Sequence, residues 1–224
     1  DGPTAPTSFA HVVGGRSWVA VALPDGLPDA QAWSGFVPRG SGALPRLQAL
    51  KQAEAEARKT GRLERAQELA EARMRAAAQA AGAAVPAEAL ARASAALGSW
   101  DERVGLRLAA GAYPALDSAR WQVDRLRALA DAHAAAGENA AAAEELAEAA
   151  VRARAFSPEA VGTRVIADAE ARIAAAAHDS GGLRRARDLL RTAREAVATG
   201  DYARAVRRAT YAVEIVDAEL PRPR

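Results

Sequence analysis

From residue 45 onward, apolar positions recur every three or four residues, which is the spacing of one face of an α-helix. The first such run begins near Leu47 and ends at Gly61, and a second run ends near Gly82. The connections between successive runs are short, which favours antiparallel neighbouring helices. Later runs, separated by Gly, Ser or Pro, predict helices over residues 86–97, 101–110, 116–135, 139–155, 158–178, 183–198 and 202–219.

The first 42 residues have a different pattern, in which short β-type runs alternate with turn residues. Residues 8–13 and 16–23 flank Gly14-Gly15, and two such runs around a Gly-Gly pair predict a β-hairpin. Residues 32–37 are compatible with a third short strand. We therefore expect a mainly α fold of antiparallel helical hairpins with a small N-terminal β-hairpin appendage. The expected division is a β-rich arm over residues 1–42 and an α-helical hairpin domain over residues 43–224.

Three of the predicted helix pairs carry small residues on both sides of a turn glycine, which is Gly61, Gly137 or Gly200. This pattern resembles the hairpins of tetratricopeptide-type proteins, in which small residues let two antiparallel helices approach closely. The turn glycines are 76 and 63 residues apart rather than multiples of about 34, so the resemblance implies an irregular α-solenoid or bundle. It also implies a protein-binding scaffold. In the clearest pair, the apolar positions around Gly200 are Leu189, Ala193, Ala196, Ala205, Ala209 and Ala212.

The composition of the chain excludes several further classes of protein and of functional site. The chain has 64 Ala among 224 residues and no Cys, and its 30 basic residues include only two Lys. The Ala and Arg bias indicates a GC-rich bacterial coding preference. Without Cys, disulfides, zinc–thiolate sites, iron–sulfur clusters and thiol nucleophiles are excluded. No run of 18 apolar residues is free of charge, so the sequence predicts no transmembrane helix.

The sequence contains no recognisable catalytic or cofactor-binding motif. His11, His133 and His178 are far apart, and none has the partner spacing of a metal site. Gly14-Gly15 and Gly40-Ser41-Gly42 lack the frame of a phosphate-binding loop and are interpreted as turns. We therefore predict that the protein is not an enzyme, with no catalytic residues, no cofactor and no bound metal.

Charge is distributed unevenly along the helices. Residues 131–150 contain five acidic residues and no Lys or Arg, whereas residues 182–211 contain eight Arg and three acidic residues. A basic stretch of this kind is a candidate docking surface for an acidic protein or for anionic lipid headgroups. Alternatively, it pairs with the acidic segment of the same chain. Nucleic acid is not expected, because no aromatic residues interleave the arginines. The candidate residues are Arg184, Arg187, Arg191, Arg194, Arg204, Arg207 and Arg208.

The few aromatic residues divide between a core role and a partner-binding role. Trp100 and Trp121 are expected in the core, because they are the largest apolar groups among small ones. Trp18, Trp33 and Phe36 lie in the N-terminal arm, which has little core of its own. We expect these three to contact a partner, because aromatic residues commonly anchor interfaces.

The chain begins Asp1-Gly2-Pro3-Thr4, a start that cleavage of a signal peptide leaves behind. A trimmed chain, or an anchor that precedes Asp1, remains an alternative. The sequence therefore favours an extracytoplasmic, membrane-peripheral and non-enzymatic subunit of a larger bacterial complex of the envelope, respiratory or photosynthetic type. Its partners would be protein subunits, with peripheral contact to anionic lipid. The alternative function is a free-standing, peptide-binding adaptor of tetratricopeptide type, and the alternative location is the cytoplasm.

Overall fold

The computed structural model describes residues 9–13, 16–20, 23, 27–98, 100, 114–176 and 181–219. This part of the chain is mainly α-helical, as predicted, whereas the helix expected over residues 101–110 and the position of His178 lie outside it. The elements are β1 (Phe9–Val13), β2 (Arg16–Ala20), α1 (Ala30–Ser34), α2 (Ala43–Lys59), α3 (Leu63–Ala81), the 3₁₀ turn η1 (Gly82–Ala84), α4 (Ala87–Gly98), α5 (Pro114–Ala135), α6 (Asn139–Arg154), α7 (Pro158–Ala175), α8 (Gly181–Ala198) and α9 (Tyr202–Glu219).

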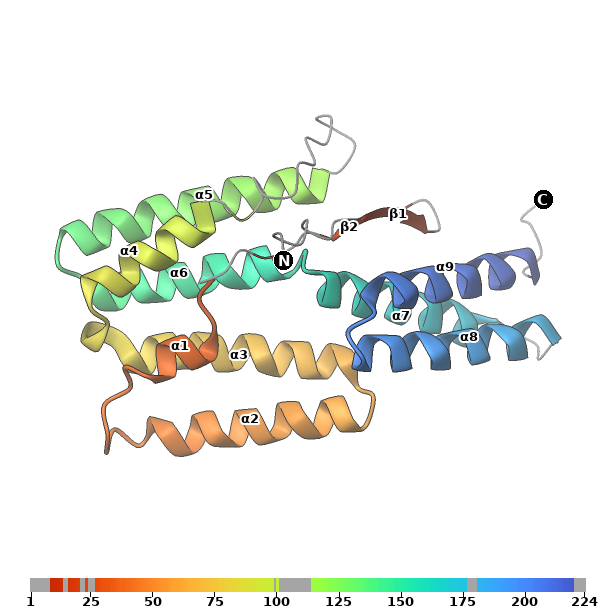
Figure 1. Ribbon diagram of the computed structural model, residues 1–224, viewed down its shortest axis with the longest axis horizontal. Coiled ribbons are helices and arrows are strands. Elements are labelled where there is room, and N and C mark those ends of the chain that lie inside the picture. The colour runs from red at the N-terminus through yellow and green to blue at the C-terminus, as the bar shows by residue number, and fades with distance from the viewer. Residues whose placement is uncertain are drawn as a thin grey trace, which may run out of the picture. The chain divides into compact units, whose positions relative to one another are not determined.

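The chain divides into two compact units. Of the described residues, the first unit contains 23, 27–98, 100 and 114–157, and the second contains 9–13, 16–20, 158–176 and 181–219. In the first unit, α3 lies between α2 and α6, and α5 packs on α6 (Figure 1). In the second unit, α8 and α9 pair with each other and both pack on α7. In the helical part of the chain, the boundary between the compact units lies between residues 157 and 158.

The three predicted helical hairpins, α2–α3, α5–α6 and α8–α9, have the same turn. Each has a single glycine with positive φ, which is +72° at Gly61, +77° at Gly137 and +78° at Gly200. In each, the residue after the glycine donates its N–H to the carbonyl five residues earlier, at 2.9, 2.8 and 2.8 Å respectively. This is the Schellman arrangement, in which the glycine N–H also bonds the last turn of the helix. The identical turns explain why the sequence shows one pattern in three places.

Small side chains occupy buried positions on both helices of the α8–α9 hairpin. Ala193, Ala205 and Ala209 are completely buried, and Ala196 is 4% exposed. Side chains of this size allow the two helix backbones to approach closely. Each alanine buries little area, but the close approach creates many contacts that compensate for this. The packing positions expected from the sequence are therefore the buried ones.

Residues 32–37 do not form the third strand that the sequence suggested. Residues 30–34 form the short helix α1, and Asp29 caps it by accepting a 2.7 Å hydrogen bond from the N–H of Ala32. A capping side chain satisfies one of the free N–H groups of the first turn, so it favours helix over strand. Burial of Ala30 and Trp33 fixes the helix in place.

The two strands of the second unit pair antiparallel, with Val13 opposite Arg16 and Phe9 opposite Ala20. A two-stranded ribbon is marginal on its own, so it needs packing against another element. β2 contacts α7 and β1 contacts α9. The hairpin thus belongs with the C-terminal helices rather than with residues 21–42.

Two glycines of the second unit provide a stability test with opposite expected signs. In Gly200→Ala, the positive φ should destabilise the chain by about 1–2 kcal/mol. In Gly162→Ala, within α7, the added methyl would meet Val197 at 3.6 Å, an ordinary contact, and helix propensity should stabilise the chain by roughly 0.5–1 kcal/mol. Urea unfolding followed by circular dichroism measures both changes. A shift in the same direction for the two variants would contradict this assignment.

Candidate functional site

Two of the three aromatic residues proposed as partner anchors are buried within the chain. Trp33 is 2% exposed and Trp18 is 7% exposed, while Phe36 is half-buried. The guanidinium carbon of Arg164 lies 5.3 Å from the centre of the Trp18 ring, a cation–π distance. The two tryptophans therefore attach β2 and α1 to the chain itself, because these short elements depend on burial for stability.

The arginines of α8 are exposed but already interact within the chain. Arg191 pairs with Asp188 at 3.8 Å and with Glu195 at 3.1 Å on the same helix. Arg194 pairs with Glu170 of α7. Arg184 and Arg187 also have partners in the chain. The arginines of α8 have the spacing that the sequence predicted, but interactions within the chain already compensate most of their charge.

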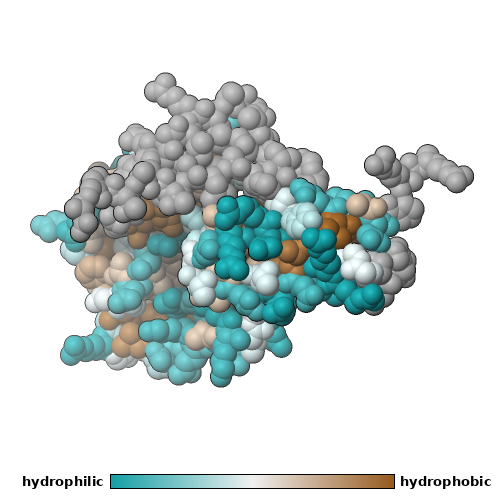
Figure 2. Space-filling model, turned by 45° about the vertical axis from the view of Figure 1, so that its right-hand side comes forward, coloured by the Kyte–Doolittle hydropathy of each residue, from teal (hydrophilic) through white to brown (hydrophobic). Residues whose placement is uncertain are grey.

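The arginines of α9 differ from those of α8 in their ion pairing. Arg204, Arg207 and Arg208 are exposed within the first turns of the helix, and none of them forms an ion pair with another described residue. Next along this face, Tyr211 is 41% exposed and accepts a 3.2 Å hydrogen bond from Arg185 of α8. We call Arg204, Arg207 and Arg208 the α9 basic face. In the view of Figure 2, most of the coloured surface is hydrophilic, with small hydrophobic patches between.

The acidic segment over residues 131–150 has partners in its own unit. Glu148 of α6 pairs with Arg75 of α3 at 2.8 Å and with Arg152 at 3.1 Å, and Glu138 contacts His133 at 2.6 Å. Burial raises the pKa of Glu71, which lies beside this group, although Arg75 opposes that shift. The ion pairs seen for Arg191 and Arg194 are with other residues, so pairing with the acidic segment does not account for them.

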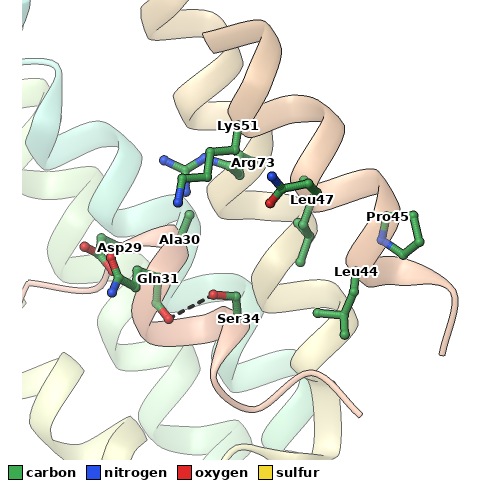
Figure 3. Close-up of a pocket in the computed structure, with 10 residues that line it drawn as sticks. Asp29, Ala30, Gln31, Ser34, Leu44, Pro45, Leu47, Lys51 and Arg73 are labelled. Carbon is green, nitrogen blue, oxygen red and sulfur yellow. Dashed lines mark hydrogen bonds between the residues drawn. The ribbon is translucent and has the colours of Figure 1, made fainter. Parts of the chain in front are cut away.

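A cleft in the first unit brings together residues that are distant in the sequence. Helices α1 and α2 both pack on α3, and a hollow of about 660 Å³ opens beside them (Figure 3). We call it the α1–α2 cleft. Its volume is within the range of ligand-binding sites. It is lined by Asp29, Ala30, Gln31, Ser34, Leu44, Pro45, Leu47, Gln48, Lys51 and Arg73.

The walls of the α1–α2 cleft differ in chemistry. Lys51 and Arg73 lie side by side at one end, and Leu44 and Pro45 lie along the start of α2 (Figure 3). Asp29 faces them from the beginning of α1. Such a combination of a cationic end and an aliphatic wall suits a ligand that is partly apolar and carries a negative charge.

Sequence reasoning missed this cleft and the exposure of Trp121. Trp121, expected in the core, is 62% exposed on α5, and Arg125 lies over its ring at 5.5 Å. Trp100 is in the core as expected, at 1% exposure. The sequence carries no clear signal for the cleft, because Lys51 is only one of four basic residues on α2.

In the described part of the chain, no group of three or more His, Asp or Glu side chains is placed to hold a metal ion. None of its helices is long and apolar enough to cross a membrane. Neither a protein-family model, nor a curated protein, nor a solved structure matches the chain. Function is therefore inferred from the residues and their geometry.

The exposure of Trp121 can be tested by fluorescence, because the other three tryptophans, at 7%, 2% and 1%, are buried. We expect Trp121→Phe to remove most of the acrylamide-quenchable, long-wavelength emission, since a solvated indole is accessible to the quencher. Trp100→Phe is the matched control and should leave the quenchable emission in place. Equal quenching of the two variants would mean that Trp121 is covered in solution.

Proposed function

We propose that this protein is a non-enzymatic helical interaction subunit that docks onto an acidic protein surface through the α9 basic face. The observation that carries the proposal is the group of three exposed arginines, Arg204, Arg207 and Arg208, without ion-pair partners among the described residues. Their spacing of three and four residues places them on one side of the helix.

The surroundings of these arginines support a protein partner. Tyr211 continues the same side of α9, and aromatic and arginine residues together are enriched at the energetic centres of protein interfaces. Complementary charge also steers association and selects partners. Arg185 lies 5.4 Å from the Tyr211 ring centre and keeps that ring oriented.

The hairpins support a scaffold of tetratricopeptide-like kind. Their three identical turns at Gly61, Gly137 and Gly200 are what repeated helical pairs require, although their unequal spacing makes the repetition irregular. We further propose that the subunit is extracytoplasmic and peripheral to a membrane, as part of a larger bacterial complex.

Charge reversal of the α9 basic face tests the docking. In the variant Arg204→Glu, Arg207→Glu and Arg208→Glu, we expect affinity for the partner to fall roughly 100-fold or more, because three charges meet like charges across the interface. Native extraction from the source cells, followed by native mass analysis, should show the wild type in a larger complex and the variant without its partner. Retention should also weaken as salt is raised above about 0.1 M.

A matched variant changes the net charge equally in the first unit. It carries Arg46→Glu, Arg62→Glu and Arg92→Glu, at exposed positions in or beside α2, α3 and α4, and should remain in the complex. If the α9 variant is also retained, or if the wild type runs alone, the proposal is wrong. If the wild type instead sediments with phosphatidylglycerol vesicles and has no protein partner, the basic face binds lipid.

A further inference from the structure

The cationic end of the α1–α2 cleft carries more positive than negative charge. Glu54 of α2 has a side chain that is 12% exposed, and it faces two guanidinium groups, those of Arg73 at 2.9 Å and Arg58 at 3.4 Å. Glu54 therefore contacts both guanidinium groups. Lys51, one turn before Glu54, is exposed and forms no ion pair with a described residue. An anion in the cleft would meet charge that the chain does not neutralise.

Arg73 is held in position before any ligand arrives. Its Nε donates a 3.0 Å hydrogen bond to Glu54, its Nη2 lies 2.9 Å from the same oxygen, and its side chain is 23% exposed. A guanidinium that is fixed and half-buried loses little conformational entropy when it binds a carboxylate. Lys51 supplies the mobile second cation beside it (Figure 3).

The remaining wall is aliphatic and faces solvent. Leu44 is 41% exposed at the beginning of α2, next to Pro45 and the more deeply placed Leu47. The exposed amides of Gln31 and Gln48 also line the cleft and form no hydrogen bond with a described residue. Free amides can pair with the N–H and C=O groups of an extended main chain.

We infer that the α1–α2 cleft binds a short acidic peptide segment in which a carboxylate lies beside aliphatic side chains. The carboxylate contacts Lys51 and Arg73, an aliphatic side chain covers Leu44, and the glutamine amides pair with the peptide main chain. Asp29 at the α1 side repels a carboxylate there, which directs the negative charge to the α2–α3 side. This second site is independent of the α9 basic face, because the two sites lie in different units.

The two lysines of the chain provide an internal control for this site. Lys51 lines the cleft and Lys59 is exposed at the end of the same helix. Reductive methylation with ¹³C-formaldehyde labels both and preserves their charge, and Lys51→Arg and Lys59→Arg assign the two signals. On titration with the peptide Ac-Leu-Glu-Leu-NH₂, we expect a saturable shift of the Lys51 signal and an unchanged Lys59 signal.

Variants of the peptide separate the parts of the recognition. Ac-Leu-Gln-Leu-NH₂ removes the charge and Ac-Gly-Glu-Gly-NH₂ removes the aliphatic groups, and both should bind more weakly than Ac-Leu-Glu-Leu-NH₂. Ac-Leu-Leu with a free carboxyl end distinguishes a terminal carboxylate from a side-chain carboxylate as the preferred anion. Sodium octanoate represents a lipid-like carboxylate, and saturable binding of octanoate without binding of the peptides would overturn the inference.

Protein variants complete the test. Lys51→Glu should weaken binding of Ac-Leu-Glu-Leu-NH₂ roughly tenfold or more, whereas Lys59→Glu should change it by less than about twofold. Leu44→Ser should weaken binding without affecting the fold, because Leu44 is exposed. Circular dichroism confirms that each variant is folded. Equal shifts of Lys51 and Lys59, or no saturable binding, would overturn the inference, whatever the result for the α9 variant.

Discussion

Close packing of small side chains between antiparallel helices is the interaction on which this structure depends. Alanine buries little area, so an alanine-rich interface stabilises only if the two helices approach closely along their whole length. The Schellman turns at Gly61, Gly137 and Gly200 provide this geometry, because each reverses the chain within three residues. Ala193 and Ala209, both completely buried, show the result in the last hairpin.

The same constraint determines where charge accumulates. Alanine occupies the inner faces of these helices. Long side chains on the outer faces must therefore provide solubility and cover part of the apolar surface, and arginine does both. On α8, these arginines find carboxylates nearby, such as Glu195 and Glu170. On α9, Arg204, Arg207 and Arg208 form no ion pair with a described residue, and the nearby carboxylate of Asp201 accepts a 3.1 Å hydrogen bond from the backbone N–H of Arg204. The difference between the two helices is one of pairing, not of composition.

The helices and their turns could be predicted from sequence because both are local. A period of three to four residues and a glycine with positive φ depend only on neighbours within one or two turns. The exposure of Trp121 could not be predicted, because it depends on which face of its helix meets another element. On α5, Leu116, Ala119 and Val123 form the inner face, so Trp121 is left outside. Similarly, the hydrogen bond from the N–H of Ala32 to the side chain of Asp29 favours the helix α1, whereas the aromatic pattern suggested a strand.

The α1–α2 cleft could not be predicted for a related reason. Its lining residues on α1 and at the start of α2 are distant in sequence from Arg73, and they come close to it only because both helices pack on α3. Glu54 then serves as a structural carboxylate that orients Arg73, which leaves Lys51 without a counter-charge among the described residues. Glu148 of the same unit, by contrast, is paired with Arg75 and Arg152. Lys51 in the α1–α2 cleft and the three arginines of the α9 basic face therefore carry positive charge without an ion-pair partner among the described residues, and such charge favours acidic partners.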